Sequence, residues 1–222
     1  MTSLAENYQN IIQRISEVAG SRKVTLIAVG KKQPVDAIFK LYELGHRDFG
    51  ENYAQELIDK AEKLRERGCL DIRWHFIGHL QSNKIKGIIP HVFAIHTVDS
   101  EKLAREISKQ WKLNGKLERL PVFVEVNIDD QESKAGISPN ETHALAGLIG
   151  SIPELSLQGL MCIPDPKFAV EASFAHLRDL ELQCRPTSQG FLSMGMSADF
   201  ETAIHFGATH VRVGTALFGE RA

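Results

Sequence analysis

The chain has 222 residues, a formal net charge of −2, 43% hydrophobic residues and 24% charged residues. This composition is ordinary for a soluble globular protein, and the small net charge excludes the strong field that attracts nucleic acid or an anionic membrane. No apolar run approaches the roughly 20 residues of a membrane helix. Residues 1–18 lack an apolar signal core, so we expect a cytoplasmic protein without membrane attachment. Three widely spaced cysteines argue against a disulfide framework and a zinc site.

An amphipathic helix is expected over residues 4–18, because Ile11, Ile15 and Val18 recur at helical spacing. Strand-like and helix-like segments then alternate eight times. The expected strands are 24–30, 47–51, 74–80, 92–98, 121–128, 156–162, 190–194 and 210–213. The expected helices are 34–44, 54–67, 83–89, 101–113, 139–150, 168–184 and 198–206, with a last turn near 216–219.

This alternation requires a parallel sheet that is covered by helices. Eight units predict a (β/α)8 TIM barrel with an additional N-terminal helix, as a single domain over residues 1–222. The chain is short for such a barrel, which typically has about 250 residues, so the loops must be tight. An open doubly wound sheet is the alternative, but no G-x-G-x-x-G follows the first strand.

The first strand, V-T-L-I-A-V-G-K, ends on a lysine. A lysine is costly to bury as a cation, so Lys31 reaches solvent, pairs with a carboxylate or reacts. The carboxyl ends of barrel strands are where chemistry takes place. Lys31 and Lys32 should point to opposite sides, and the pattern alone leaves open which of them points inward.

The last two units have the composition of an anion site. F-L-S-M-G-M-S supplies the hydroxyls of Ser193 and Ser197, and V-R-V-G-T-A supplies Arg212, the Gly214 backbone and the Thr215 hydroxyl. The loops after strands seven and eight are the recurrent phosphate site of these barrels. The alternative is that Ser193 and Thr215 are ordinary turn residues.

An amine on the first strand and a phosphate site on the last two are neighbours in a closed barrel. A small phosphorylated aldehyde satisfies both, and pyridoxal 5'-phosphate (PLP) fits this description as a lysine imine. Arg212 would then meet the pyridine nitrogen and, as a permanent cation, keep it unprotonated. H75-F-I-G-H79 is no metal pair, because residues four apart on a strand are about 13 Å apart.

Several blocks resemble the pyridoxal-phosphate homeostasis proteins, which are related to the N-terminal barrel of alanine racemase. The blocks are A-V-G-K at 28–31, F-G-E-N-Y at 49–53, H-F-I-G-H-L-Q-S-N-K at 75–84, G-L-M at 159–161, S-M-G-M-S-x-D-F at 193–200 and V-R-V-G-T-x-x-F-G at 211–219. The resemblance implies that Lys31, rather than Lys32, carries the imine. It also implies that phosphate contacts Ser193, Gly214 and Thr215, that the pyridine nitrogen contacts Arg212, and that Asn52, His79 and Met161 line the pocket.

Two positions depart from the family pattern, in which Ser more often precedes the lysine and a second Lys follows two residues after it. Here these positions are Gly30 and Gln33. We expect Gly30 to loosen the loop and Gln33 to remove a positive charge near the pocket.

The favoured hypothesis is a monomeric binding protein that buffers PLP, hands it to apoenzymes and affects vitamin B6 and amino-acid balance. The chain ends just after the eighth strand, without the domain that supplies a catalytic tyrosine to alanine racemase. Of Tyr8, Tyr42 and Tyr53, only the last is near the predicted pocket. The alternatives are a PLP-dependent amino-acid racemase and a barrel enzyme that acts on sugar phosphates without PLP.

Overall fold

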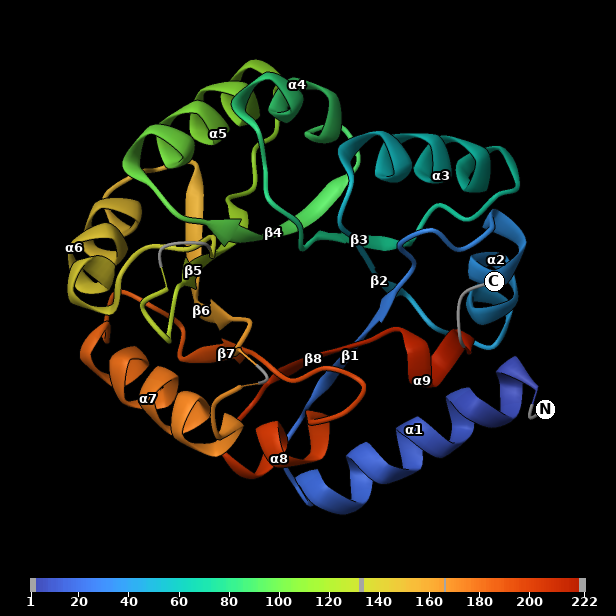
Figure 1. Ribbon diagram of the computed structural model, residues 1–222. Coiled ribbons are helices and arrows are strands. Elements are labelled where there is room, and N and C mark those ends of the chain that lie inside the picture. The colour runs from blue at the N-terminus through green and yellow to red at the C-terminus, as the bar shows by residue number, and fades with distance from the viewer. Residues whose placement is uncertain (1–2, 132–133, 166, 220–222) are drawn as a thin grey trace.

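The computed structural model describes residues 3–131, 134–165 and 167–219. Its eight parallel strands pair in chain order, and the last strand pairs with the first, so the sheet is a closed barrel. Figure 1 shows the ring of helices outside the strands. The predicted (β/α)8 TIM barrel with an additional N-terminal helix is therefore confirmed.

The strands are β1 (Thr25–Val29), β2 (Asp48–Glu51), β3 (Arg73–Phe76), β4 (Val92–Val98), β5 (Leu120–Val126), β6 (Leu155–Cys162), β7 (Phe191–Ser193) and β8 (His210–Val213). The helices are α1 (Leu4–Ala19), α2 (Val35–Glu43), α3 (Ala54–Glu66), α4 (Ile85–Ile88), α5 (Glu101–Leu113), α6 (Pro139–Gly150), α7 (Val170–Gln183), α8 (Phe200–His205) and α9 (Thr215–Phe218), with a 3-10 turn at Ser82–Lys84. No helix in these described ranges is long and apolar enough to span a bilayer.

The third strand is shorter than the sequence predicts. It ends at Phe76, whereas we expected it to reach residue 80, so that part of the prediction was wrong. At Gly78 the chain runs against the segment that follows β2: a Cβ atom on Gly78 would lie 2.1 Å from the carbonyl oxygen of Asn52. The close backbone approach diverts the chain here, and His79 consequently lies in a loop beyond the strand.

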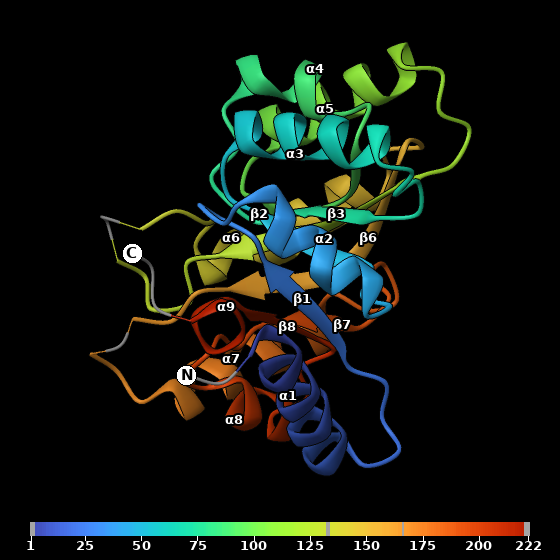
Figure 2. The same cartoon turned by 90° about the vertical axis from the view of Figure 1, so that its right-hand side faces the viewer.

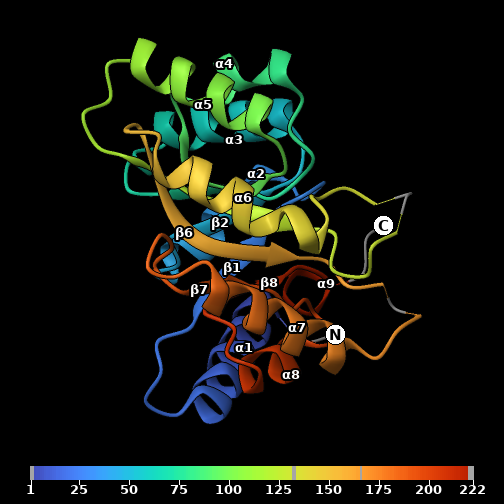
Figure 3. The same cartoon turned by 90° about the vertical axis from the view of Figure 1, so that its left-hand side faces the viewer.

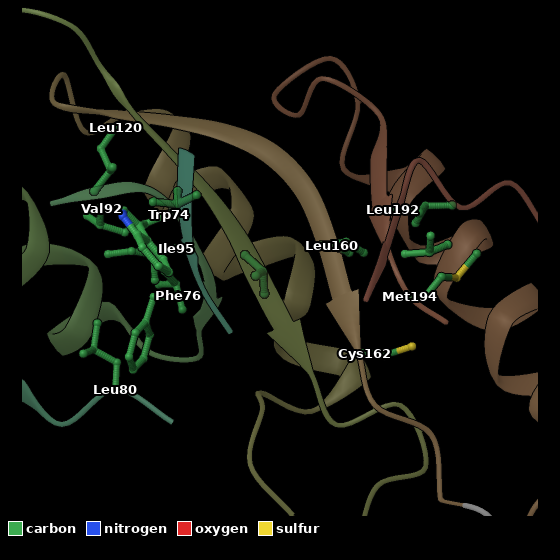
Figure 4. Close-up of a cluster of buried hydrophobic side chains, with 14 of the residues drawn as sticks. Trp74, Phe76, Leu80, Val92, Ile95, Leu120, Leu160, Cys162, Leu192 and Met194 are labelled. Atoms are coloured by element: carbon green, nitrogen blue, oxygen red, sulfur yellow. The ribbon is translucent and has the colours of Figure 1, made fainter. Parts of the chain in front are cut away.

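Side-chain alternation divides the buried residues between two layers. The larger layer lies between strands and helices and includes Trp74, Phe76 and Ile95, as Figure 4 shows. Of the buried apolar side chains in the described residues, five lie outside this cluster: Ile27, Ile77, Ala94, Phe123 and Met161. Several of the side chains inside the barrel are polar, so they must find hydrogen-bond partners there.

The N-terminal helix α1 packs beside α8 and α9 (Figures 2 and 3). A capping box starts it, because the Ser3 hydroxyl accepts from the Glu6 amide while the Glu6 carboxylate accepts from the Ser3 amide. Asn7 donates to the carbonyl oxygen of Leu217 over 3.1 Å. The additional helix thereby holds the turn that follows the last strand.

Candidate functional site

Three of the residues predicted for the site meet at one cavity. Lys31 is half-buried in the turn after β1 and lines a cavity of about 430 Å³ together with Asn52 and His79. Its Nζ atom lies 5.7 Å from the centroid of the Tyr53 ring, within the range of a cation–π contact. Lys32 is exposed and does not line this cavity. Of the two neighbouring lysines, Lys31 is therefore the one that faces the cavity, which Lys84 also lines.

A buried ion-pair network fixes the backbone on both sides of Lys31. The Lys60 ammonium, on α3, donates to the Gly30 carbonyl and to Glu51 Oε1, both over 2.7 Å, and to Glu56 Oε2 over 2.9 Å. Glu56 Oε2 in turn accepts from the Lys32 amide over 2.8 Å. The network thus holds the peptide groups before and after the lysine, so that its side chain leaves the turn in one direction.

Gly30 is packed tightly into this network. A Cβ atom there would lie 2.7 Å from Glu51 Oε1 and 2.8 Å from Ile38 Cδ1. A side chain at this position would therefore displace Glu51 or Ile38, and the expectation that Gly30 loosens the loop stays a prediction. Burial raises the pKa of Glu51 to about 7, although the nearby Lys60 ammonium opposes this shift.

A second group of predicted residues lies on the β6–β8 side of the barrel, around Arg212. This guanidinium is buried, with 4% of the residue exposed. Nη1 donates to the carbonyl oxygen of Ser193 over 2.7 Å and to its hydroxyl over 2.9 Å, and Nη2 donates to the carbonyl oxygen of Cys162 over 2.8 Å. All three acceptors are neutral, so they orient the cation without neutralising it.

The two serines of the S-M-G-M-S segment have different surroundings. Ser193 is fully buried, and its hydroxyl contacts Arg212 and, over 2.9 Å, His96 Nδ1. The Ser197 hydroxyl instead accepts from the Gly214 and Ala216 amides, over 3.2 and 3.3 Å. Two backbone donors thus converge on one oxygen beside Thr215, which is an arrangement suited to anions. The contact between Ser193 and phosphate stays a prediction.

Met161 and an unpredicted carboxyl group lie next to Ser193 in the barrel. Met161 is fully buried on β6, in register with Ser193 on β7 and with Glu125 on β5. Burial raises the pKa of Glu125 to about 7, the Asp99 charge adds to this rise, and Arg212 opposes it. Its Oε2 atom has no hydrogen-bond partner among the described residues. Side chains two residues apart on a strand share one face, so Glu125 lies on the same face of β5 as Phe123. This alternation is the sequence signal that could have identified Glu125 as a residue inside the barrel.

The two groups meet where the barrel closes. Ala28 on β1 is in register with Val213 on β8, and a Cβ atom on Gly214 would lie 3.4 Å from Val29 Cβ. The turn with Lys31 and the turn with Gly214 therefore follow neighbouring strands at the same end of the barrel, as Figure 2 shows. The cavity beside Lys31 does not extend to the second group, which consists of Met161, Ser193, Arg212, Gly214 and Thr215.

Comparisons with known proteins give the family. Residues 1–222 match the family described as "Alanine racemase, N-terminal domain". A pyridoxal phosphate homeostasis protein of Pseudomonas aeruginosa is 42% identical to this chain over its full length and over 97% of the relative. The human pyridoxal phosphate homeostasis protein is 38% identical over the full chain and 85% of its own length. The chain belongs to the pyridoxal phosphate homeostasis protein family.

Solved structures agree with membership of the pyridoxal phosphate homeostasis protein family. PipY of Synechococcus elongatus, solved with PLP bound, is 32% identical and has a TM-score of 0.86 over 98% of this chain and 100% of its own. Alanine racemase of Corynebacterium glutamicum is 16% identical, with a TM-score of 0.72 over 98% of this chain and 61% of its own. The racemase shares the fold alone with this homeostasis-family chain.

Proposed function

We propose that this chain binds PLP as an imine on Lys31 and serves in PLP homeostasis. One observation carries the proposal: the turn with the Lys31 amine and the turn with the Gly214 and Ala216 amides follow directly paired strands. A phosphorylated aldehyde needs an amine at one end and anion donors at the other. The PLP-bound structure of PipY supports the same assignment for a relative.

Each residue of the site has its own proposed role in holding PLP. Gly214, Thr215 and Ser197 would hold the phosphate through amides and hydroxyls, which bind a dianion without net positive charge. Arg212 would face the pyridine nitrogen, with Ser193 orienting it. Asn52, His79 and Met161 would line the rest of the pocket. When bound, the cofactor supplies an electron sink, and a permanently cationic arginine at its ring nitrogen weakens that sink.

We infer a carrier rather than an enzyme, because no tyrosine among the described residues is placed as a second acid–base group for Lys31. Tyr42 donates its hydroxyl to Asp71, and Tyr8 packs against His46 at the other end of the barrel. Tyr53 contacts Lys31 through its ring and is 47% exposed. A two-base racemase needs a positioned acid on the opposite face of the substrate.

Absorption spectra before and after borohydride test the site. Purified protein incubated with PLP should show an imine band that reduction removes, leaving the cofactor covalently attached to Lys31. Lys31→Ala should lose the band completely while retaining the fold and most of the phosphate affinity. Lys32→Ala is the matched control and should keep the band. A band of unchanged intensity in Lys31→Ala would refute the assignment.

The carrier role has a separate test. We infer a monomer of one domain, residues 1–222, that works in the cytoplasm and passes PLP to apoenzymes. Loaded protein mixed with an apo-aminotransferase should restore aminotransferase activity, and gel filtration should give one chain. Incubation with single L-amino acids in deuterium oxide should give negligible α-proton exchange. Rapid PLP-dependent exchange would favour a racemase instead.

A further inference from the structure

A continuous hydrogen-bonded chain crosses the interior of the barrel behind Arg212. Asp48 Oδ1 at the start of β2 lies 3.1 Å from His75 Nε2, and His75 Nδ1 lies 2.9 Å from His96 Nε2. His96 Nδ1 lies 2.9 Å from the Ser193 hydroxyl, which contacts Arg212 Nη1. We call this chain, Asp48–His75–His96–Ser193, the histidine relay.

The relay has a buried centre and one end at a cavity. His96 is fully buried, and the Phe123 ring stacks on it with centroids 4.2 Å apart. His75 and Asp48 line a cavity of about 460 Å³ at the amino-terminal end of the barrel, together with Arg73 and His210. Arg73 pairs with both oxygens of Asp48. The relay therefore connects a carboxylate at one end of the barrel with Arg212 at the other.

The donors and acceptors of the relay fit together in one direction. Arginine only donates, so the Ser193 hydroxyl oxygen accepts from Arg212, which leaves its hydrogen available to His96 Nδ1. Burial lowers the pKa of His96 well below its usual value, which favours a neutral ring. If Nδ1 accepts from Ser193, the hydrogen of this ring is on Nε2. That hydrogen is donated to His75 Nδ1, and His75 Nε2–H is donated to Asp48. The opposite direction would need hydrogens on both nitrogens of His75, because the Asp48 carboxylate only accepts.

We propose that His96 and His75 are positioning residues, which orient the Ser193 hydroxyl so that its lone pairs hold the Arg212 guanidinium against the cofactor. The proposal rests on the proposed function, since Arg212 is the residue assigned to the pyridine nitrogen. A carboxylate at the far end polarises each hydrogen bond in the same direction, and such networks strengthen their members cooperatively. The relay thus supplies negative polarity to a buried cation whose direct partners are all neutral.

Nitrogen-15 NMR of the histidines tests the direction without any cofactor. In the cofactor-free protein, His96 should carry its hydrogen on Nε2, and the Nδ1 atoms of both His75 and His96 should have the chemical shift of a hydrogen-bond acceptor. A hydrogen on His96 Nδ1 would overturn the proposed direction. Because no PLP is present, this result is independent of the proposed function.

Variants at His96 test the positioning role. His96→Phe removes the acceptor for Ser193 and should speed PLP transfer to an apo-aminotransferase about fivefold, the factor for one neutral hydrogen bond. His96→Asn places an amide oxygen near the position of Nδ1, so this variant should keep PLP almost as long as the wild type does. His210→Phe changes a neighbouring ring outside the relay and should match the wild type in PLP retention.

Two outcomes would refute the positioning role: equal acceleration in His96→Phe and His210→Phe, or no recovery in His96→Asn. A wild-type protein that never forms the imine band would instead refute the proposed function. The NMR experiment would still test the direction of the hydrogen bonds in the histidine relay.

Discussion

The two sides of the carboxyl-terminal mouth hold their key residues in different ways. On the β1–β3 side, the Lys31 turn is fixed from outside the barrel by the ions Glu51, Lys60 and Glu56. On the β6–β8 side, Arg212 is fixed from inside the barrel by neutral oxygens. One side therefore depends on charge balance, and the other depends on hydrogen-bond geometry.

The difference follows from where each support lies. The layer between sheet and helices reaches solvent at its edge, since the Glu56 side chain is 30% exposed, so an ion pair there keeps some hydration. Arg212 is buried in the barrel interior, where a second ion would cost on the order of 3–5 kcal/mol if its pairing were imperfect. Neutral acceptors orient the arginine and leave its charge available to a ligand.

The largest expected effect comes from breaking the charge balance. Lys60→Met leaves Glu51 buried without its cation and frees the Gly30 carbonyl, so the free energy of unfolding should fall by about 3–5 kcal/mol. Urea denaturation of the cofactor-free protein measures this loss. PLP retention should fall as well, because the turn with Lys31 loses its anchor.

The exposed Lys63, on the same helix, provides the control. Lys63→Met should change the free energy of unfolding by less than about 0.5 kcal/mol. If Lys60→Met were no less stable than Lys63→Met, the ion-pair network would not support the turn.

The second-largest expected effect is a pH dependence of the free energy of unfolding, which arises from Glu125 inside the barrel. Its pKa is raised from 4.5 to about 7, so between these pH values the folded state retains a proton that the unfolded chain has released. The stability that the protonated form contributes is present below about pH 4.5 and is lost as the pH rises to 7. The shift corresponds to about 3 kcal/mol.

Glu125→Gln keeps the shape of the side chain and removes its titration. The stability of this variant relative to the wild type should increase between pH 5 and pH 8, as measured by urea denaturation at each pH. Glu118→Gln, at an exposed position, should show no such trend. A constant difference between Glu125→Gln and wild type across this range would contradict the raised pKa.

Sequence patterns predicted the barrel because alternating apolar segments of strand and helix length leave few other architectures. They also placed Lys31, Asn52 and His79 at one end of the barrel. They did not predict the early end of β3, because it depends on two backbone segments that meet at Gly78. The Glu51–Lys60 pair and the histidine relay were missed for a related reason. Their members come from different elements, and only the register of the closed sheet shows which side chains face each other.

The smallest expected effect is a change in cofactor binding that distinguishes the roles of the two serines of the S-M-G-M-S segment. Ser197→Ala removes the hydroxyl beside the Gly214 and Ala216 amides and should weaken PLP binding by about 1 kcal/mol, roughly fivefold. Binding of pyridoxal, which lacks the phosphate, should be unchanged. Ser193→Ala acts through Arg212 instead, so it should weaken PLP and pyridoxal by the same factor. If Ser193→Ala affected only the phosphorylated form, Ser193 would contact phosphate directly, and the support of Arg212 would be left to its carbonyl partners.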